Sequence, residues 1–220
     1  MTRRYGTVLF DLDGTLADTA PDLAYSLNSV RAEESLPPLP FAQIRPHVSN
    51  GARALIKLGF QTDETHPDFE RRRQRLLAIY RDNLCKETRL FPGIDAVVDE
   101  IERRAGKWGI VTNKPGWLTE PLLEQLGLRR RVTCVVSGDT VARRKPHPEP
   151  LLHAAKLASS APSDCVYVGD ASRDVLAAHA AGMAMLAAAF GYIEPGQNPH
   201  DWGADAVIEH PDEILAWVAI

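Results

Sequence analysis

FDLDGTLADT, residues Phe10 to Thr19, follows the short apolar run Thr7–Leu9. A short apolar run that ends in polar and glycine residues is typical of a buried strand. Two acids, Asp11 and Asp13, stand where this strand should end. Because like charges this close repel each other, the pair costs stability unless other groups compensate it. The stretch therefore predicts a buried strand that delivers functional carboxylates at its carboxyl end.

The composition is that of an ordinary globular protein without a strong charge bias. The chain has 220 residues, 45% of them hydrophobic, which suits one large domain or a core domain with an insertion. The net charge of −4 gives no basic field of the kind that binds nucleic acid or an anionic membrane. The local run Arg71–Arg73, with Arg75, is interpreted as a solvated helix face. No segment approaches the ~20 apolar residues that would span a bilayer. We therefore expect no nucleic-acid partner and no membrane.

The cysteines favour a reducing compartment. Cys85, Cys134 and Cys165 are widely spaced, odd in number and without a CxxC pair, which argues against a disulfide framework or a zinc site. The apolar part of the first residues is too short for a signal peptide. We expect free thiols and a cytoplasmic protein.

Apolar runs alternate with helical patterns through most of the chain. This alternation predicts an α/β core of the Rossmann-like type, in which a parallel sheet is covered by helices on both faces. In such sheets, ligands bind beyond the carboxyl ends of the strands. The expected strands are Thr7–Asp11, Lys107–Thr112, Val132–Ser137, Asp164–Gly169, Met183–Ala188 and Ala206–Ile208, and the helices between them are Ile94–Ala105, Pro115–Leu126, Pro148–Ala158 and Ser172–Ala181.

Residues 19–90 interrupt this alternation. They show helical patterns and no convincing strand, so we expect an α-helical domain inserted after the first strand, which we call the cap. Residues 1–18 and 91–220 would then form the core domain. Asp18, at the entrance to the cap, is expected to be a hinge or helix-capping residue. The expected helices of the cap are Pro21–Glu34, Phe41–His47, Gly51–Leu58 and Pro67–Cys85.

Polar side chains follow the later strands as well as the first. Thr112–Lys114 ends the second strand, Lys145 stands in the loop after the third, and Asp170 ends the fourth with Asp174 close behind. Because the carboxyl ends of parallel strands meet at one edge of a sheet, we expect these groups to converge on one crevice. The plain alternative, that the first acids only cap a helix, explains none of the later groups.

The expected cluster of carboxylates points to a metal and to phosphoryl transfer. Carboxylates with few balancing cations are costly, and a bound Mg²⁺ offsets that cost. Mg²⁺ prefers oxygen ligands and is usually held by carboxylates, water and substrate phosphate. One carboxylate can then attack phosphorus and form an acyl phosphate, and another can act as general acid and base. The sequence therefore predicts a Mg²⁺ cofactor and a small phosphate ester as substrate.

Four short motifs follow one another over essentially the whole chain: DLDGTL at Asp11–Leu16, VTNK at Val111–Lys114, KPHP at Lys145–Pro148 and GDASRD at Gly169–Asp174. Together, and in this order, they resemble the motifs of the haloacid dehalogenase superfamily. The resemblance implies the fold of that superfamily, with a helical cap after the first motif. It also implies a phosphatase rather than a dehalogenase, since the acid at Asp13 would protonate the leaving oxygen of a phosphate ester.

The resemblance assigns the chemical steps to three residues. Asp11 would be the nucleophile and a Mg²⁺ ligand. Asp13 would be the general acid and base, with its backbone carbonyl on the metal. Lys145 would pair with Asp11 and with the phosphate.

Four further residues receive binding roles from the same resemblance. Thr112 and the backbone of Asn113 would hold the phosphate. Asp170 would be a Mg²⁺ ligand, directly or through water. Asp174 would support the metal waters or orient the lysine.

Other stretches narrow the resemblance within the superfamily. Asp18–Asp22 resembles the phosphoglycolate phosphatase group. Val48–Ala54 in the cap and the tail stretches Phe190–Ile193 and Asn198–Asp205 more closely resemble the N-acetylmuramic acid 6-phosphate phosphatases of bacterial cell-wall recycling. We therefore expect N-acetylmuramic acid 6-phosphate as the substrate, with 2-phosphoglycolate as the alternative.

The leaving group of the substrate should face the cap, so cap residues would set specificity. Arg53 and Asn50 are the first candidates for substrate binding, with Ser49 and His47 beside them. Arg53 could pair with a carboxylate, which both candidate substrates carry.

Two other functions stay open at this point. A phosphosugar mutase of the same superfamily would keep its phosphoenzyme away from water. A non-catalytic phosphate-binding module would also cluster acids and a lysine at strand ends, although such modules lack a helical insertion after the first strand. The chain is expected to act as a monomer or homodimer.

Overall fold

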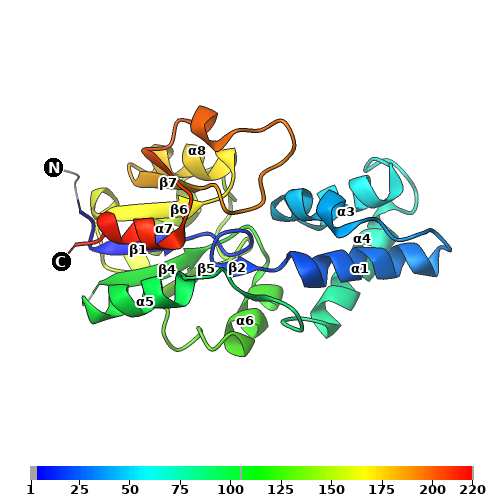
Figure 1. The fold of residues 1–220 in the computed structure, drawn as a ribbon, viewed down its shortest axis with the longest axis horizontal. Helices are drawn as coiled ribbons and strands as arrows, with labels where there is room; N and C mark the ends of the chain where they lie inside the picture. Colours follow the sequence, from blue (N-terminus) through cyan, green and yellow to red (C-terminus); the bar gives the residue numbers. More distant parts are fainter. Residues whose placement is uncertain (1–3, 105, 220) are drawn as a thin grey trace.

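The computed structural model describes residues 4–104 and 106–219 and has an α/β architecture. Six parallel strands form one sheet in the order β5-β4-β1-β6-β7-β8, with helices on both faces (Figure 1). The Rossmann-like core predicted from the alternating patterns is therefore confirmed. The strands of this sheet are β1 Thr7–Phe10, β4 Lys107–Val111, β5 Cys134–Val136, β6 Cys165–Gly169, β7 Ala184–Ala188 and β8 Ala206–Ile208.

The helices of the core domain cover an apolar cluster on each face of the sheet. They are α5 Ile94–Arg103, α6 Gly116–Gln125, α7 Glu149–Leu157 and α8 Ser172–Ala180, with the 3₁₀ helices η2 Pro162–Asp164, η3 Pro199–Trp202 and η4 Pro211–Ala216. Val8 and Phe10 of β1 belong to the same cluster as apolar residues of α5 and α6. Leu9, between them, belongs to the cluster of α7 and α8. Successive residues of a strand point to opposite faces, so an unbroken apolar strand needs both layers.

β1 lies at the centre of the sheet, between β4 and β6. The chain builds outward from β1 in both directions, which makes its carboxyl end the point where the strand order reverses. Ligands of open α/β sheets bind in the crevice at this point. Asp11, Thr112 and Asp170 each directly follow one of these three strands, so they start from adjacent strand ends.

The helices of the cap lie beyond one end of the sheet (Figure 1). They are α1 Ala20–Glu33, α2 Phe41–Ile44, α3 Gly51–Phe60 and α4 Phe69–Asp82, with the 3₁₀ helix η1 Arg45–Asn50. The two passages of the chain between core and cap pair as the short antiparallel strands β2 Ala17–Asp18 and β3 Arg89–Leu90. The Asp22 carboxylate, in α1, links the outgoing passage to the returning one. It accepts hydrogen bonds from the backbone N–H groups of Glu87 and Thr88 and from the Thr88 hydroxyl.

The structure corrects the sequence prediction in two places within the cap. The expected helix Phe41–His47 is the single α-turn of α2 followed by η1, since Pro46 has no N–H to continue an α-helical ladder. β3 lies in a stretch for which the sequence predicts no strand. Its two residues are extended only because they pair with β2 where the cap joins the core. In the core, the expected helix end at Ala105 lies outside the described residues.

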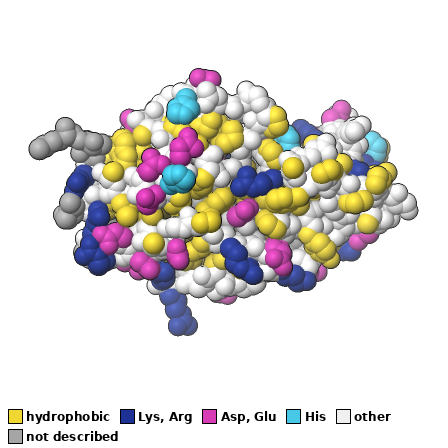
Figure 2. All heavy atoms as spheres, in the orientation of Figure 1, with side chains coloured by type: hydrophobic (Ala, Val, Ile, Leu, Met, Phe, Trp, Pro, Cys, Tyr) yellow, Lys and Arg dark blue, Asp and Glu magenta, His cyan; other side chains and the backbone are white. Residues whose placement is uncertain are grey.

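The surface shows no gathering of positive charge on the face in Figure 2, where Lys and Arg side chains are interspersed with Asp and Glu. Within residues 4–104 and 106–219, no helix is both long enough and apolar enough to cross a membrane.

Candidate active site

Lys145 and two acids form a buried ion-pair group at the carboxyl end of β1. Its ammonium Nζ lies 3.0 Å from Asp11 Oδ2 and 2.9 Å from Asp174 Oδ1. It also donates to the Val111 carbonyl at 3.0 Å and to the Tyr167 hydroxyl at 2.6 Å. Burial raises the pKa of Asp11, and the charge of Lys145 opposes that rise. The lysine therefore holds together two carboxylates that would otherwise repel each other.

Asp170 brings a third carboxylate to the same place. One oxygen each of Asp11, Asp170 and Asp174 lie within 4.8 Å of one another. Asp170 Oδ2 accepts hydrogen bonds from the Ser49 hydroxyl of the cap at 2.7 Å and from the Tyr192 N–H at 3.0 Å. Its Oδ1 is buried without a hydrogen-bond partner among the described residues. Burial, and then the charges of Asp11 and Asp174, raise the pKa of Asp170 to about 7.

This cluster fits a divalent metal ion. A buried, unpartnered carboxylate oxygen and a raised carboxyl pKa both mark negative charge that the side chains around it leave uncompensated. Hard cations such as Mg²⁺ take oxygen ligands of this kind. The backbone carbonyl of Asp13 belongs to the same group, because the Ser49 hydroxyl that donates to Asp170 also lies 3.3 Å from that carbonyl oxygen.

Asp13 makes its side-chain contacts with other partners. Its Oδ1 accepts hydrogen bonds from the Thr19 hydroxyl at 2.6 Å and from the Lys114 ammonium at 2.9 Å. The turn after it needs Gly14, whose φ is +83° and where a Cβ would lie 2.0 Å from Asp170 Oδ2. Only glycine combines that backbone conformation with that close approach. The turn thus brings both Asp11 and Asp13 to the crevice but with different partners: Lys145 for Asp11, and Thr19 and Lys114 for Asp13.

Thr112 and Asn113 follow β4 next to this group. The buried Thr112 hydroxyl accepts a hydrogen bond from the Lys114 N–H at 3.1 Å. The Asn113 side chain donates to the Lys145 carbonyl at 3.0 Å and accepts from the Lys145 N–H at 3.1 Å. This pair of bonds fixes the loop that carries the lysine, a role that the sequence pattern does not reveal.

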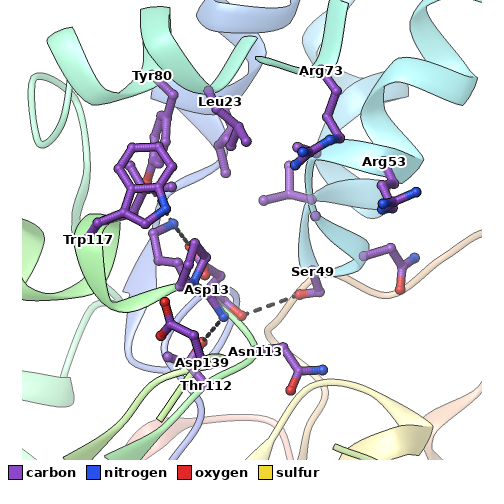
Figure 3. A pocket seen from close by; sticks show the side chains of 18 of the residues that line it. Asp13, Leu23, Ser49, Arg53, Arg73, Tyr80, Thr112, Asn113, Trp117 and Asp139 are labelled. Carbon is purple, nitrogen blue, oxygen red and sulfur yellow. Dashed lines mark hydrogen bonds and ion pairs between the residues drawn. The ribbon is translucent and has the colours of Figure 1, made fainter. Parts of the chain in front are cut away.

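A cavity of about 870 Å³ lies between the strand ends and the cap. Asp11, Asp13 and Thr112 from the strand ends are among its lining residues. Figure 3 shows Trp117 and Tyr80 on one side of it and Arg53 and Arg73 on the other. The cavity therefore joins the acids of the core to one aromatic wall and one cationic wall.

Three of the four predicted binding residues of the cap line this cavity: Ser49, Asn50 and Arg53. The fourth, His47, is not among the residues that line the cavity. Arg53 lines it and forms an ion pair with an acid of the cap. Asn50 lines it as well, donating to Glu194 at 2.8 Å and accepting from Arg173 at 2.9 Å. His47 Nδ1 lies 2.9 Å from Glu194 Oε1. Asn50 and His47 thus join the cap to the core through one glutamate.

The interpretation of the arginine run as a solvated helix face is wrong for two of its members. Arg72 is only 13% exposed and pairs with Glu34, and Arg73 lines the cavity. For Arg73 the sequence does contain an indication in its helical spacing. Arg73, Leu77 and Tyr80 stand at i, i+4 and i+7 on one face of α4, and all three line the cavity.

Comparison with known proteins agrees with this arrangement. The model of the family described as haloacid dehalogenase-like hydrolase matches residues 8–188. The crystal structure of a predicted phosphoglycolate phosphatase from Haemophilus somnus 129PT matches with a TM-score of 0.86 and 27% sequence identity, covering 96% of this chain and 97% of that one.

Two curated relatives cover nearly the whole chain. A phosphoglycolate phosphatase of Xanthomonas campestris pv. campestris (strain 8004) is 42% identical in an alignment of 219 residues that covers 96% of each of the two chains. An N-acetylmuramic acid 6-phosphate phosphatase of Pseudomonas aeruginosa is 40% identical over 212 residues, which cover 96% of this chain and 94% of the relative. The chain therefore belongs to the haloacid dehalogenase-like hydrolase family, as its four motifs predict, and it is an enzyme of the phosphatase type.

Proposed function

We propose that this phosphatase hydrolyses N-acetylmuramic acid 6-phosphate with Mg²⁺ and forms an aspartyl-phosphate intermediate. The observation that carries the mechanism is the buried group of acids around Lys145, which opens onto one large cavity. In this proposal residues 1–18 and 91–220 form the core domain that performs the chemistry. Residues 19–90 form the cap domain that surrounds the leaving group.

Asp11 and Asp13 carry the bond changes. A carboxylate oxygen of Asp11 attacks phosphorus, and the bond from phosphorus to the ester oxygen breaks. Asp13 gives a proton to the departing alkoxide and then takes one from the water that cleaves the acyl phosphate. Free phosphate leaves and the Asp11 carboxylate is restored. A mutase would instead return the phosphoryl group to a sugar, so release of free phosphate as the main product separates the two.

The remaining residues hold charge in place. Lys145, the Thr112 hydroxyl and the Asn113 backbone bind the phosphoryl oxygens. Mg²⁺ would be held by Asp170, by the Asp11 carboxylate and by the backbone carbonyl of Asp13, and it would supply positive charge against the phosphoryl group and the carboxylates. Asp174, through its 2.9 Å contact with the lysine ammonium, keeps that lysine oriented.

The cavity supports a substrate with a large leaving group. Its volume of about 870 Å³ falls in the ~300–1,000 Å³ range of pockets that hold drug-sized ligands, far larger than the two-carbon acid of phosphoglycolate requires. The half-exposed ring of Trp117 in the aromatic wall suits the apolar face of a sugar ring. Arg53 and Arg73 suit a carboxylate, which the lactyl group of muramic acid provides. Each also pairs with a glutamate of the cap, Glu64 and Glu70 respectively, and keeps further N–H donors for a ligand. The relative from Pseudomonas aeruginosa bears the name of this activity.

Phosphoglycolate is the second candidate, because the relative from Xanthomonas campestris, at 42% identity, is named for it. The deciding experiment compares kcat/KM for phosphate release from the two esters by the purified protein with Mg²⁺. We expect N-acetylmuramic acid 6-phosphate to be preferred by at least about tenfold, which corresponds to ~1.4 kcal/mol of additional transition-state binding. A clear preference for 2-phosphoglycolate would overturn the proposed substrate while leaving the mechanism intact.

Trp117 provides a second test of the substrate. Its side chain is 48% exposed although it is large and apolar, and it lines the cavity from the start of α6. We expect Trp117→Ala to lower kcat/KM for the phosphosugar about tenfold, because the aromatic face is lost, and to change phosphoglycolate hydrolysis much less. Trp117→Phe is the matched control and should retain most of the activity. Equal losses on both esters would argue against a sugar-binding role.

A further inference from the structure

Lys114 is a buried lysine that the proposed steps do not use. Its Nζ lies 2.9 Å from Asp13 Oδ1, and its side chain is only 6% exposed. At this distance the two groups form an ion pair, and a buried charge of this kind needs fixed partners.

The second partner of this ammonium comes from the cap. Nζ of Lys114 donates to the hydroxyl of Tyr80, on α4, at 3.0 Å and lies 4.5 Å from the centroid of the Tyr80 ring. Tyr80 is fully buried, and burial raises its pKa to about 12. Its hydroxyl is therefore neutral and serves as an acceptor. A side chain of the cap is thus connected to the Asp13 carboxylate through a single lysine.

The backbone of Lys114 has little freedom to move. Its N–H donates to the Thr112 hydroxyl at 3.1 Å, and its carbonyl accepts hydrogen bonds from the Gly138 N–H at 2.8 Å and the Thr119 hydroxyl at 3.3 Å. The side chain is held at its other end by Asp13 and by the phenol of the cap. The lysine is therefore fixed along its whole length between β4 and α4.

This arrangement distinguishes the two oxygens of Asp13. Oδ1 accepts hydrogen bonds from both the Thr19 hydroxyl and the Lys114 ammonium. Oδ2 accepts no hydrogen bond from the described residues. The first oxygen anchors the carboxyl group, and the second is the one that can carry a proton to a leaving oxygen. Catalytic proton transfer depends on such placement, since misplacement by about 1 Å can cost ~10²-fold in rate.

We propose that Lys114 and Tyr80 are positioning residues for the general acid, so that the cap contributes to proton transfer as well as to substrate binding. Tyr80 holds the ammonium against Asp13 Oδ1, and the ammonium fixes the direction in which Oδ2 points. The inference rests on the proposed role of Asp13 as general acid and base. It assigns a function to a contact between core and cap that involves no atom of the substrate.

The test separates proton transfer from all other effects by changing the leaving group. Tyr80→Phe removes only the hydroxyl, and Lys114→Met removes the charge with a side chain of similar length. Single-turnover release of the leaving group is measured for N-acetylmuramic acid 6-phosphate, or for the best alkyl ester if another is preferred, and for p-nitrophenyl phosphate. Nitrophenolate leaves without needing a proton, whereas an alkoxide needs one.

We expect each variant to release the alkyl group about tenfold or more slowly and nitrophenolate at nearly the normal rate, within the ~10²–10⁴-fold that a general acid provides. The double variant should be no slower than Lys114→Met alone, because the hydroxyl acts through the lysine. Tyr25→Phe, at a tyrosine of α1 that is 57% exposed, is the matched control and should behave as wild type.

Equal slowing on both esters, or losses that add in the double variant, would overturn the proposal. Asp13→Asn decides whether such a failure lies with this inference or with the mechanism. If Asp13→Asn shows the dependence on leaving group and the other two variants do not, only the positioning role is wrong. If Asp13→Asn lacks the dependence as well, the general acid is wrongly assigned and the inference falls with it.

Discussion

Asp11→Asn is expected to abolish phosphate release, with a loss of at least about 10⁴-fold in kcat, as for the removal of other enzymatic nucleophiles. An amide nitrogen or amide oxygen at this position is a far weaker nucleophile than a carboxylate, and no acyl phosphate can form. Steady-state phosphate release with Mg²⁺ measures the loss. Acid-quenched protein should carry labelled phosphate in the wild type and none in the variant.

The variant should remain folded, which makes the result interpretable. Lys145 keeps its 2.9 Å ion pair with Asp174 and its bonds to Val111 and Tyr167, so the buried ammonium is not left without partners. Asp95→Asn, at an exposed acid in the first turn of α5, is the matched control and should keep normal rates. A near-normal rate for Asp11→Asn, with the thermal unfolding of the wild type, would rule out this residue as the nucleophile.

Asp170→Asn is expected to remove the stabilisation that Mg²⁺ confers on the wild type. A ligand at one hundred times its dissociation constant stabilises a protein by about 2.7 kcal/mol. For a chain of this size that is a rise of about 5–11 °C in Tm. The variant should show little or no rise over the same range of Mg²⁺ concentrations, and it should lose activity. A rise in Tm equal to that of the wild type would exclude Asp170 as a metal ligand.

In the absence of metal, the same substitution should stabilise the protein, and the gain should depend on pH. Burial, and then Asp11 and Asp174, raise the pKa of Asp170 from 3.8 to about 7. Between these values the folded state retains a proton that the unfolded state has lost, so the stability of the wild type falls as the pH rises. Above about pH 7 Asp170 is ionised in the folded state too, and the full cost of burying its charge lowers the free energy of unfolding of the wild type. That cost is on the order of a few kcal/mol, at ~1.4 kcal/mol per pKa unit.

Asparagine carries no charge, so it avoids this penalty. Chemical unfolding in EDTA at pH 5 and pH 8 should show Asp170→Asn to be more stable than the wild type, with the larger advantage at pH 8. Asp95→Asn, which is remote from the cluster, should show no such advantage. A variant that is less stable than the wild type at pH 8 would mean that Asp170 is already compensated by its bonds from Ser49 and Tyr192.

Local patterns were sufficient for the core and for the identities of its acids. A strand buried on both faces must be apolar at successive positions, and residues 8–10, 108–111 and 165–169 satisfy that condition. Parallel strands place their carboxyl ends together, so residues that follow such strands must converge. The grouping of Asp11, Lys145, Asp170 and Asp174 follows from these two rules and from the order of the motifs.

Local sequence patterns did not predict where each helix and strand ends or which further side chains line the cavity. Helical spacing places Arg73 on the same face of α4 as Leu77 and Tyr80, but only the packing of α4 over the strand ends makes that face a wall of the cavity. Arg71, on another face, pairs with Glu34 and Asp68. Trp117 shows no sequence signal that distinguishes a packing residue from a cavity residue. Both positions depend on how two helical layers meet, which a local pattern does not contain.

The sequence by itself determined which residues could do chemistry: an apolar strand must end before Asp11, and acids at its end demand compensating charge. The motifs already predict that Lys145 pairs with Asp11, but tertiary structure alone decided how the charge of Asp13 is compensated. Lys145 pairs with Asp11 and Asp174. Lys114 instead pairs with Asp13 and also donates a hydrogen bond to Tyr80 of the cap. Two lysines of identical chemistry take different roles because a buried ammonium must be held by whichever acceptors the folded chain brings within hydrogen-bond distance.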